Sequence, residues 1–132
     1  MIKEAYCSFK VAKLLKEKGF DKPCRSYFID NVDYIDSSYS TEELTDLQMG
    51  VWEILRPTHQ MACAWLREIH NKHCDIGYDI DLKWFFQIID LKETVEYDYH
   101  EMKIYHAENS TGFNSYEEAT EAAIKYTLEN LL

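Results

Sequence analysis

The stretch 114–132 (NSYEEATEAAIKYTLENLL) constrains the fold more than any other part of the chain. Ser115 and Glu118 fit a capping box, in which two side chains bond the free backbone N–H groups at the start of a helix. Glu117 and Glu121 add negative charge near the positive end of that helix. Apolar residues cover more than half of its circumference, and several are alanines, which permit close packing. The pattern predicts a C-terminal helix that lies flat on a sheet.

Two further helices are predicted. Ser8 can cap a helix that runs to Lys18, and Gly19 suits the left-handed position just after its end. In 57–71, apolar residues recur every three or four positions, which is typical of an amphipathic helix. Pro57 suits its first turn, because the N–H that proline lacks has no partner there.

The first half of the chain also predicts a hairpin. Residues 25–29 and 32–36 are short and rich in β-forming side chains, and the pair Asp30-Asn31 separates them as a turn. Residues 36–50 form the least structured stretch, where we expect a loop. Residues 51–55 predict a strand or an edge segment.

Three antiparallel strands are predicted between the second and the last helix. Residues 75–82 alternate between apolar residues and residues that are mostly acidic, which predicts a half-buried strand. The nearly continuous apolar run 84–89 is typical of a central strand. A turn at Lys92-Glu93 leads to a third strand within 95–106, long or broken in two. The residues assigned to the buried side of the first strand are Ile76, Tyr78, Ile80 and Leu82.

Together these elements predict an α+β fold, with an antiparallel sheet of three or more strands packed against two or three helices. The order is α-β-β-α-β-β-β-α. A chain of 132 residues has room for one domain, so we expect residues 1–132 to form it. Its first part, 1–56, holds the helix, hairpin and loop, and 57–132 holds the helix, three strands and final helix.

Charge and hydropathy narrow the functional classes. The chain carries 24 acidic and 14 basic residues, a net charge of −10. Such a protein repels phosphate, so we expect neither nucleic-acid binding nor docking on anionic membranes. No apolar run approaches the ~20 residues of a membrane span, and the start Met1–Glu4 lacks the apolar core of a signal peptide. We therefore expect a cytoplasmic protein whose four cysteines are reduced.

Three helical blocks carry a family resemblance: SFKVAKLLKEKGF (8–20), PTHQMACAWLREIHN (57–71) and SYEEATEAAIKYTLENLL (115–132). Together they resemble a family of short uncharacterised proteins from gut bacteria and their prophages. Members commonly show a Ser-Tyr-Glu-Glu-Ala start and a Leu-Glu-Asn-Leu end in the last helix. The resemblance implies a phage or mobile-element context, and it implies no activity and no site residues.

The order helix, three strands, helix in 57–132 is also similar to the double-stranded-RNA-binding domain. In that domain the last helix begins with lysines that hold phosphates. This chain has Tyr116, Glu117 and Thr120 at those positions. The resemblance therefore implies the fold and argues against RNA binding, because a fold alone does not carry a function.

Histidines and cysteines gather around the helix predicted over 57–71. His59, Cys63 and His70 lie on one edge of it, and His73 and Cys74 follow its end. Imidazole and thiolate at such spacings can bind Zn²⁺. The alternative is that they border the apolar face as partly buried residues, with the cysteines packing as small hydrophobes. Because no paired-cysteine knuckle occurs, we assign no metal ligand and no cofactor.

Catalytic signatures do not accompany these residues. A Cys-His nucleophile pair would need an oxyanion donor, and the sequence has no Gly-rich turn, phosphate-binding loop or nucleophile elbow to supply one. We therefore do not expect an enzyme, and no catalytic residue is assigned.

Aromatic and acidic residues mix in two regions, and protein interfaces favour aromatic anchors. The alternative is that most of these rings fill the core. We expect a non-enzymatic module that binds an unknown protein or a second copy of itself as a homodimer. Two alternatives stay open: an acidic mimic of nucleic acid that blocks a DNA-binding enzyme through Asp75, Asp79 and Asp81, and a metal-binding protein. The aromatic and acidic residues are Tyr34, Asp36, Tyr39, Tyr97, Asp98, Tyr99 and Glu101.

Overall fold

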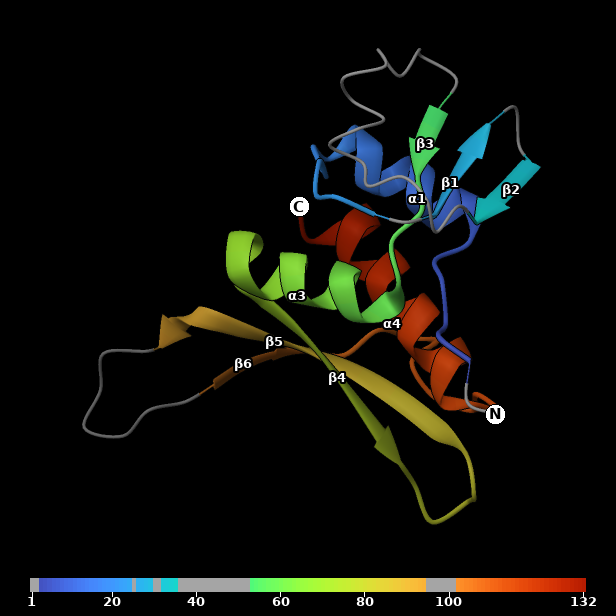
Figure 1. Cartoon of the computed structure of the whole chain (residues 1–132). Coiled ribbons are helices and arrows are strands. Elements are labelled where there is room, and N and C mark those ends of the chain that lie inside the picture. Colours follow the sequence, from blue (N-terminus) through green and yellow to red (C-terminus); the bar gives the residue numbers. More distant parts are fainter. Residues whose placement is uncertain (1–2, 25, 30–31, 36–52, 95–101) are drawn as a thin grey trace. The chain divides into compact units, whose positions relative to one another are not determined.

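The computed structural model describes residues 3–24, 26–29, 32–35, 53–94 and 102–132. Helices and antiparallel sheets alternate along them, which confirms the predicted α+β class (Figure 1). None of the helices in the described ranges is long and apolar enough to span a bilayer. The elements are α1 (Phe9–Glu17), β1 (Ser26–Ile29), β2 (Val32–Ile35), β3 (Glu53–Leu55), α3 (His59–His70), β4 (Lys72–Tyr78), β5 (Trp84–Thr94), β6 (Met102–Tyr105) and α4 (Tyr116–Asn130).

By its internal contacts the chain divides into two compact units, Met1–Ala62 and Cys63–Leu132, with the boundary inside α3. The single domain expected over 1–132 stays a prediction. So does the loop expected over 36–50, which lies outside the described residues.

The first unit holds an antiparallel sheet in the order β2-β1-β3. Tyr27 of β1 lies opposite Tyr34 of β2 on one side and Leu55 of β3 on the other. Phe28 and Ile54 are buried with Ala12 of α1 in one hydrophobic cluster. The predicted hairpin is confirmed, and β3 lies within the segment expected to form a strand.

Helix α1 begins and ends as its sequence predicts. The Ser8 hydroxyl accepts a hydrogen bond from the Val11 N–H at 3.3 Å. Gly19 has a φ of 92°, the left-handed conformation that glycine adopts without steric cost. The Phe20 N–H then donates to the Leu15 carbonyl at 2.9 Å, and the Phe20 ring is buried. This return bond is the Schellman pattern of a helix C-terminus.

Helix α3 starts slightly later than predicted. The Thr58 hydroxyl accepts from the Met61 N–H at 3.2 Å, so Thr58 caps the helix. Pro57 therefore precedes the cap and does not lie in the first turn, where we had placed it. Its carbonyl instead accepts from the Cys7 N–H at 3.0 Å, and the His59 N–H donates to the Ala5 carbonyl at 2.9 Å.

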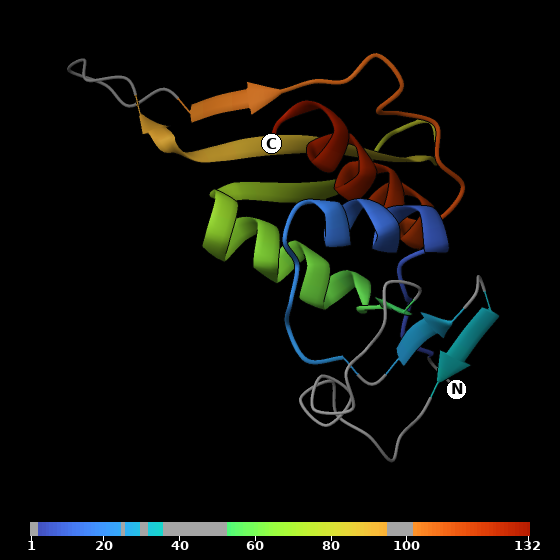
Figure 2. The ribbon, with the colours of Figure 1, turned by 90° about the horizontal axis from the view of Figure 1, so that it is seen from above.

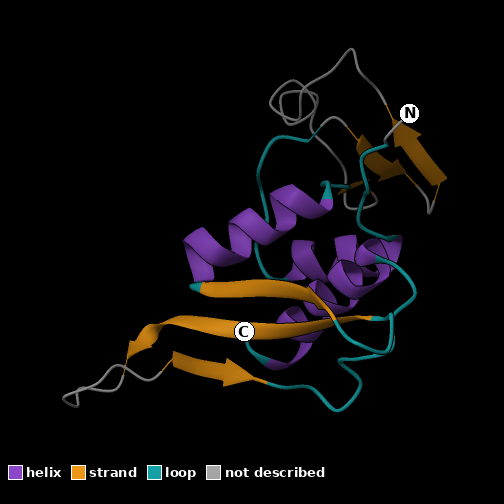
Figure 3. Cartoon of the chain, turned by 90° about the horizontal axis from the view of Figure 1, so that it is seen from below, coloured by secondary structure: helices purple, strands orange, loops and turns teal. Residues whose placement is uncertain are grey.

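The second unit holds the antiparallel sheet β4-β5-β6, with β5 in the centre. Helix α4 lies along one face of this sheet, as the views from above and below show (Figures 2 and 3). Cys74 of β4 lies opposite Ile88 of β5, which in turn lies opposite Tyr105 of β6. Opposite residues share a face of a sheet. The buried residues of α4 on this layer are Ala119, Thr120, Ala123, Ile124, Thr127 and Leu128.

The N-terminus of α4 confirms the cap. The Ser115 hydroxyl accepts from the Glu118 N–H at 3.1 Å. The Glu118 carboxylate accepts from the Asn114 N–H at 3.2 Å, one residue before the position that a capping box uses. The buried hydroxyls of Thr120 and Thr127 donate to carbonyls four residues back, so burial leaves both satisfied.

Two predicted strand boundaries are wrong. Strand β4 begins at Lys72 and ends at Tyr78, so Ile80 and Leu82 lie outside it, 96% and 75% exposed. The cause is the Asp79 side chain, which accepts hydrogen bonds from the backbone N–H groups of Asp81 and Lys83. These bonds stabilise a turn in place of a continued strand. The predicted turn at 92–93 lies inside β5, which continues to Thr94 through an irregularity in its pairing with β6.

A close contact between Gly77 and Phe85 gives a testable prediction. The two residues are opposite in the β4–β5 pair, and a Cβ at Gly77 would lie 2.3 Å from Phe85 Cζ. We expect Gly77→Ala to displace this ring and to lower the free energy of unfolding by ~1–2 kcal/mol. Urea denaturation in wild-type and Phe85→Ala backgrounds measures the effect. An equal cost in both backgrounds would contradict the contact.

Candidate functional site

Of the five predicted histidines and cysteines, Cys63 and Cys74 affect the pKa of each other. His70 packs edge-on against Trp65, with ring centroids 4.6 Å apart. His73 is the neighbour of Cys74 in β4, so it faces the other side of the sheet. Among the described residues of the second unit, no three His, Cys or acidic side chains bring ligand atoms within 4.8 Å of one another. His59 heads α3 and is buried.

The pKa values of these two thiols shift in opposite directions. The Cys74 thiol donates a hydrogen bond to the Cys63 sulfur, and this bond lowers the pKa of Cys63. Burial opposes the shift, and the positive charge of Arg67, one helical turn later, supports it. The same hydrogen bond and burial raise the pKa of Cys74. Of the two thiols, Cys63 is the one whose pKa is lowered.

The cysteines of the first unit contrast with this pair. Cys24 is buried, and burial raises its pKa to about 12. Its thiol donates to the Lys22 carbonyl at 3.3 Å. Cys7 is also fully buried. The thiolate is the reactive form of cysteine, so Cys24 is inert at neutral pH.

The turn between β4 and β5, residues 79–83, forms an exposed hairpin tip. Asp79 Oδ1 accepts from the Asp81 N–H at 2.9 Å and from the Lys83 N–H at 3.2 Å. The Asp79 N–H donates to the Lys83 carbonyl, and the Leu82 N–H donates to the Asp79 carbonyl. These bonds fix the backbone, so the exposed side chains of Ile80 and Leu82 are presented in a defined arrangement.

Rings support the base of the hairpin tip. The Trp84 ring lies 4.9 Å from that of Tyr78 and 5.4 Å from that of Tyr116, centroid to centroid. Trp84 also exchanges two backbone hydrogen bonds with Phe113, at 2.9 and 3.0 Å. The Lys83 ammonium donates to the Asn114 side chain. The tip is therefore tied to the segment that leads into α4.

The structure describes the three aspartates of the predicted acidic surface but only one residue of the predicted aromatic and acidic regions. Asp75 is half-buried in β4 and accepts from the Gln87 amide at 2.7 Å, whereas Asp79 and Asp81 belong to the hairpin tip. The three carboxylates therefore do not line one strand face. Tyr34 lies in β2, and the other aromatic and acidic residues singled out with it lie outside the described residues.

Sequence reasoning missed Ile80 and Leu82 as surface residues, because it placed them on the buried side of a strand. The signal that could have found them is Asp79, since an aspartate that bonds the backbone two residues on is typical of a turn.

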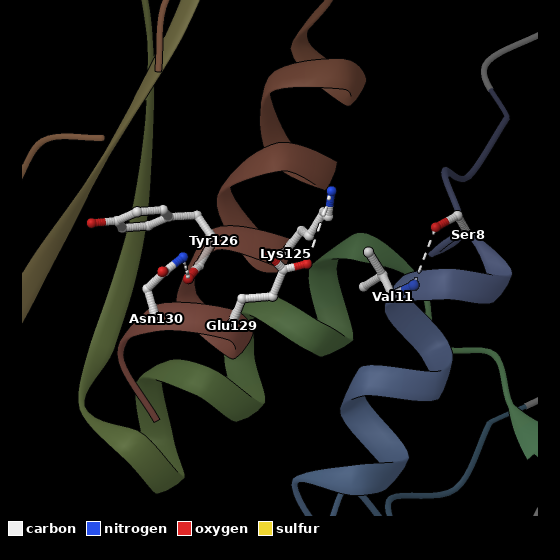
Figure 4. Close-up of polar contacts among 6 residues, drawn as sticks. All are labelled: Ser8, Val11, Lys125, Tyr126, Glu129 and Asn130. Atoms are coloured by element: carbon white, nitrogen blue, oxygen red, sulfur yellow. Dashed lines mark hydrogen bonds and ion pairs between the residues drawn. The ribbon is translucent and has the colours of Figure 1, made fainter. Parts of the chain in front are cut away.

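A hollow of about 470 Å³ lies beside α4 in the second unit. Phe86 and Tyr126 contribute rings 5.9 Å apart. On α4, Lys125 and Glu129 approach to 3.9 Å, and the Asn130 amide donates to the Tyr126 carbonyl (Figure 4). Side chains of both charges line the hollow, so charge alone selects neither an anion nor a cation. Its remaining lining residues are His106, Ala107, Glu108, Asn109 and Ala122.

Comparisons with known protein families, with curated proteins and with solved structures found no match. The resemblances to gut-bacterial and prophage proteins and to the RNA-binding domain therefore stay predictions.

Proposed function

We propose that this chain is a non-enzymatic protein-binding module whose hairpin tip inserts Ile80 and Leu82 into an apolar groove of a partner protein. The observation that supports this most is the exposure of these side chains, 96% and 75%, on a turn whose backbone is fixed by hydrogen bonds. Burying one such side chain is worth ~1.5–3 kcal/mol. Two of them, presented on a backbone that is already ordered, can act as the anchors of an interface.

The backbone of Leu82 supports the same proposal. Leu82 has a φ of 59°, a left-handed conformation that costs a residue with a Cβ roughly 1–2 kcal/mol. Glycine or asparagine adopts it more easily. The exposed leucine side chain recovers little of this cost by packing within the chain. Backbone strain of this kind is concentrated at functional sites. Burial of the Leu82 side chain by a partner would offset its cost.

Charge sets the chemistry of the partner. Asp79 and Asp81 flank Ile80, and the whole chain has a net charge of −10. A groove rimmed by Lys and Arg complements this tip, and such a rim raises the association rate at low salt. The resemblance of the three helical blocks favours a phage or mobile-element setting, with the partner in the cytoplasm.

Affinity capture from host cells tests the proposal. The baits are the wild-type chain, Ile80→Ser/Leu82→Ser, and the control Ile69→Ser, which alters an apolar residue of α3 that is 53% exposed. We expect one protein to be captured equally by the wild type and the control and about tenfold less by the double variant. The interaction is then rebuilt from purified components at low and high salt.

Two results would overturn the proposal. One is a double variant that retains every captured protein. The other is a purified wild-type chain that turns over a substrate. Sedimentation of the wild type alone shows whether the groove belongs to a second copy of this chain, in which case the double variant sediments as a monomer and the partner assigned here is wrong.

A further inference from the structure

We propose that the hollow beside α4 binds a free amino acid with an aromatic side chain. The hollow, of about 470 Å³, is formed within the second unit by residues of β5, of the segment after β6 and of α4. Small-molecule sites in proteins span roughly 300–1,000 Å³ and combine an apolar floor with a few polar groups. None of the residues 79–83 of the hairpin tip lines it, so this inference is independent of the partner proposed above.

The floor of the hollow is aromatic. Phe86 of β5 is buried, and its ring centroid lies 5.9 Å from that of Tyr126 on α4, with the two ring planes inclined at 48°. Ala107 and Ala122 contribute only methyl groups to the lining, so space remains beside the rings. A third ring can pack on such a pair edge-on or offset, at centroid distances of about 4.5–7 Å. This floor therefore favours a ligand with a planar ring.

A pair of opposite charges on α4 also lines the hollow. Lys125 Nζ and Glu129 Oε1 are 3.9 Å apart, whereas a charge-assisted hydrogen bond measures roughly 2.7–2.9 Å. The two side chains are 40% and 39% exposed, so water screens the pair and little is lost when a ligand separates the two groups. A ligand carboxylate can then bind Lys125 while a ligand ammonium binds Glu129, and every charge keeps a partner. An α-amino acid carries both groups on one carbon.

The last turn of α4 favours the ammonium as well. The final carbonyls of a helix carry partial negative charge, because they lack partners within the helix. Asn130 ends α4, and its side-chain N–H donates to the Tyr126 carbonyl at 3.1 Å, which leaves the side-chain oxygen as an acceptor. Glu108 adds a second carboxylate to the lining. The ammonium of a ligand therefore has acceptors on α4 and on the segment after β6.

The aromatic and charged parts of the lining suit the two ends of one ligand. Figure 4 shows that the Tyr126 ring extends from α4 in one direction and the Lys125–Glu129 pair in another, although all three residues line the hollow. An aromatic amino acid has a ring at one end and a zwitterion at the other. A nucleotide fits less well, because Glu108 and Glu129 repel its phosphates.

Titration of the full chain with four small molecules, followed by NMR of its backbone amides, tests the inference. The probes are L-phenylalanine, phenylpropionate, which lacks the ammonium, phenethylamine, which lacks the carboxylate, and glycine, which lacks the ring. Because much of the polar lining is exposed, we expect L-phenylalanine to bind with a dissociation constant on the order of 0.1–1 mM. Each of the other probes should bind about tenfold more weakly. The shifts should centre on the amides around Asn109 and Tyr126.

Two charge variants separate the roles of the pair. Glu129→Gln should weaken L-phenylalanine about tenfold and leave phenylpropionate unchanged, because the lost carboxylate is the partner of the ammonium. Lys125→Met should weaken L-phenylalanine and phenylpropionate and leave phenethylamine unchanged. The control Glu117→Gln removes a carboxylate of the same helix outside the hollow, and it should bind each probe as the wild type does.

Three results would overturn the inference. The first is L-phenylalanine that gives no saturable shift at about ten times the expected dissociation constant. The second is a probe without the ammonium, the carboxylate or the ring that binds as tightly as L-phenylalanine. The third is a loss of binding in Glu117→Gln that equals the loss in Glu129→Gln.

Discussion

Replacing Lys72 by methionine is expected to lower the free energy of unfolding by about 3 kcal/mol. Lys72 and Asp90 are opposite residues of β4 and β5, and Lys72 Nζ lies 2.7 Å from Asp90 Oδ2. Their side chains are only 15% and 4% exposed. Removing the ammonium withdraws a cation from a buried carboxylate, and a buried charge that loses its counter-charge is costly. Urea denaturation followed by tryptophan fluorescence measures the loss.

A matched control is available on α4. Lys125 and Glu129 form an ion pair at 3.9 Å with side chains 40% and 39% exposed, so water screens it. Lys125→Met should change the stability by no more than ~0.5 kcal/mol. The double variant Lys72→Met/Asp90→Leu should recover most of the loss, because it removes both charges together. If Lys72→Met costs no more than Lys125→Met, the buried pair does not stabilise the sheet.

Leu82→Asn is expected to move stability and partner binding in opposite directions. Asparagine tolerates the left-handed backbone better than leucine does, so the variant should be at least as stable as wild type and up to ~1 kcal/mol more stable. The same change removes an apolar side chain that is 75% exposed and that we assign to the interface. We therefore expect partner affinity to fall by about ten- to a hundredfold. Thermal unfolding and titration of the reconstituted complex give the two numbers.

The contrast with Ile69→Asn makes this result specific. Ile69 is an exposed apolar residue in the interior of α3, where asparagine is a poorer helix former than isoleucine. That variant should lose a little stability and keep its affinity, the reverse of Leu82→Asn. Two results would contradict this prediction. One is a Leu82→Asn variant that is less stable than wild type, and the other is one that binds the partner as tightly as wild type.

The helices were predictable because their signals are local. Ser8 and Ser115 each bond an N–H three residues ahead, and Gly19 ends α1 within the same short stretch. A capping bond of this kind needs no information from distant parts of the chain. The hairpin β1–β2 was predictable for the same reason.

The sheets were less predictable, because alternation shows which residues share a face and does not show which strands pair. Residues 79–82 continue the alternation of β4, yet the Asp79 carboxylate bonds the backbone ahead of it and ends the strand. The pairing of β5 with β6 likewise carries β5 past the expected turn at 92–93. The end of β4 and the extension of β5 both depend on which hydrogen bonds the backbone forms. The hydropathy pattern of the sequence does not show this.

The arrangement of the predicted histidines and cysteines was beyond sequence reasoning as well. Cys63 and Cys74 were grouped with three histidines by spacing along a helix, but Asn71 reverses the chain between them. In β4, which follows the reversal, His73 and Cys74 are successive residues and therefore point to opposite sides of the sheet. Spacing along a single helix therefore does not describe how these five residues lie.

The bond pair between Trp84 and Phe113 has a consequence for amide exchange. These backbone bonds, together with the contact of Lys83 with Asn114, join the hairpin tip to the segment before α4. Opening the tip far enough to free the Trp84 amide also frees the Phe113 amide, because each bonds the carbonyl of the other. The two amides should thus exchange with solvent in one event. A partner bound to the hairpin tip should therefore also slow hydrogen exchange of the Phe113 amide, which it does not contact.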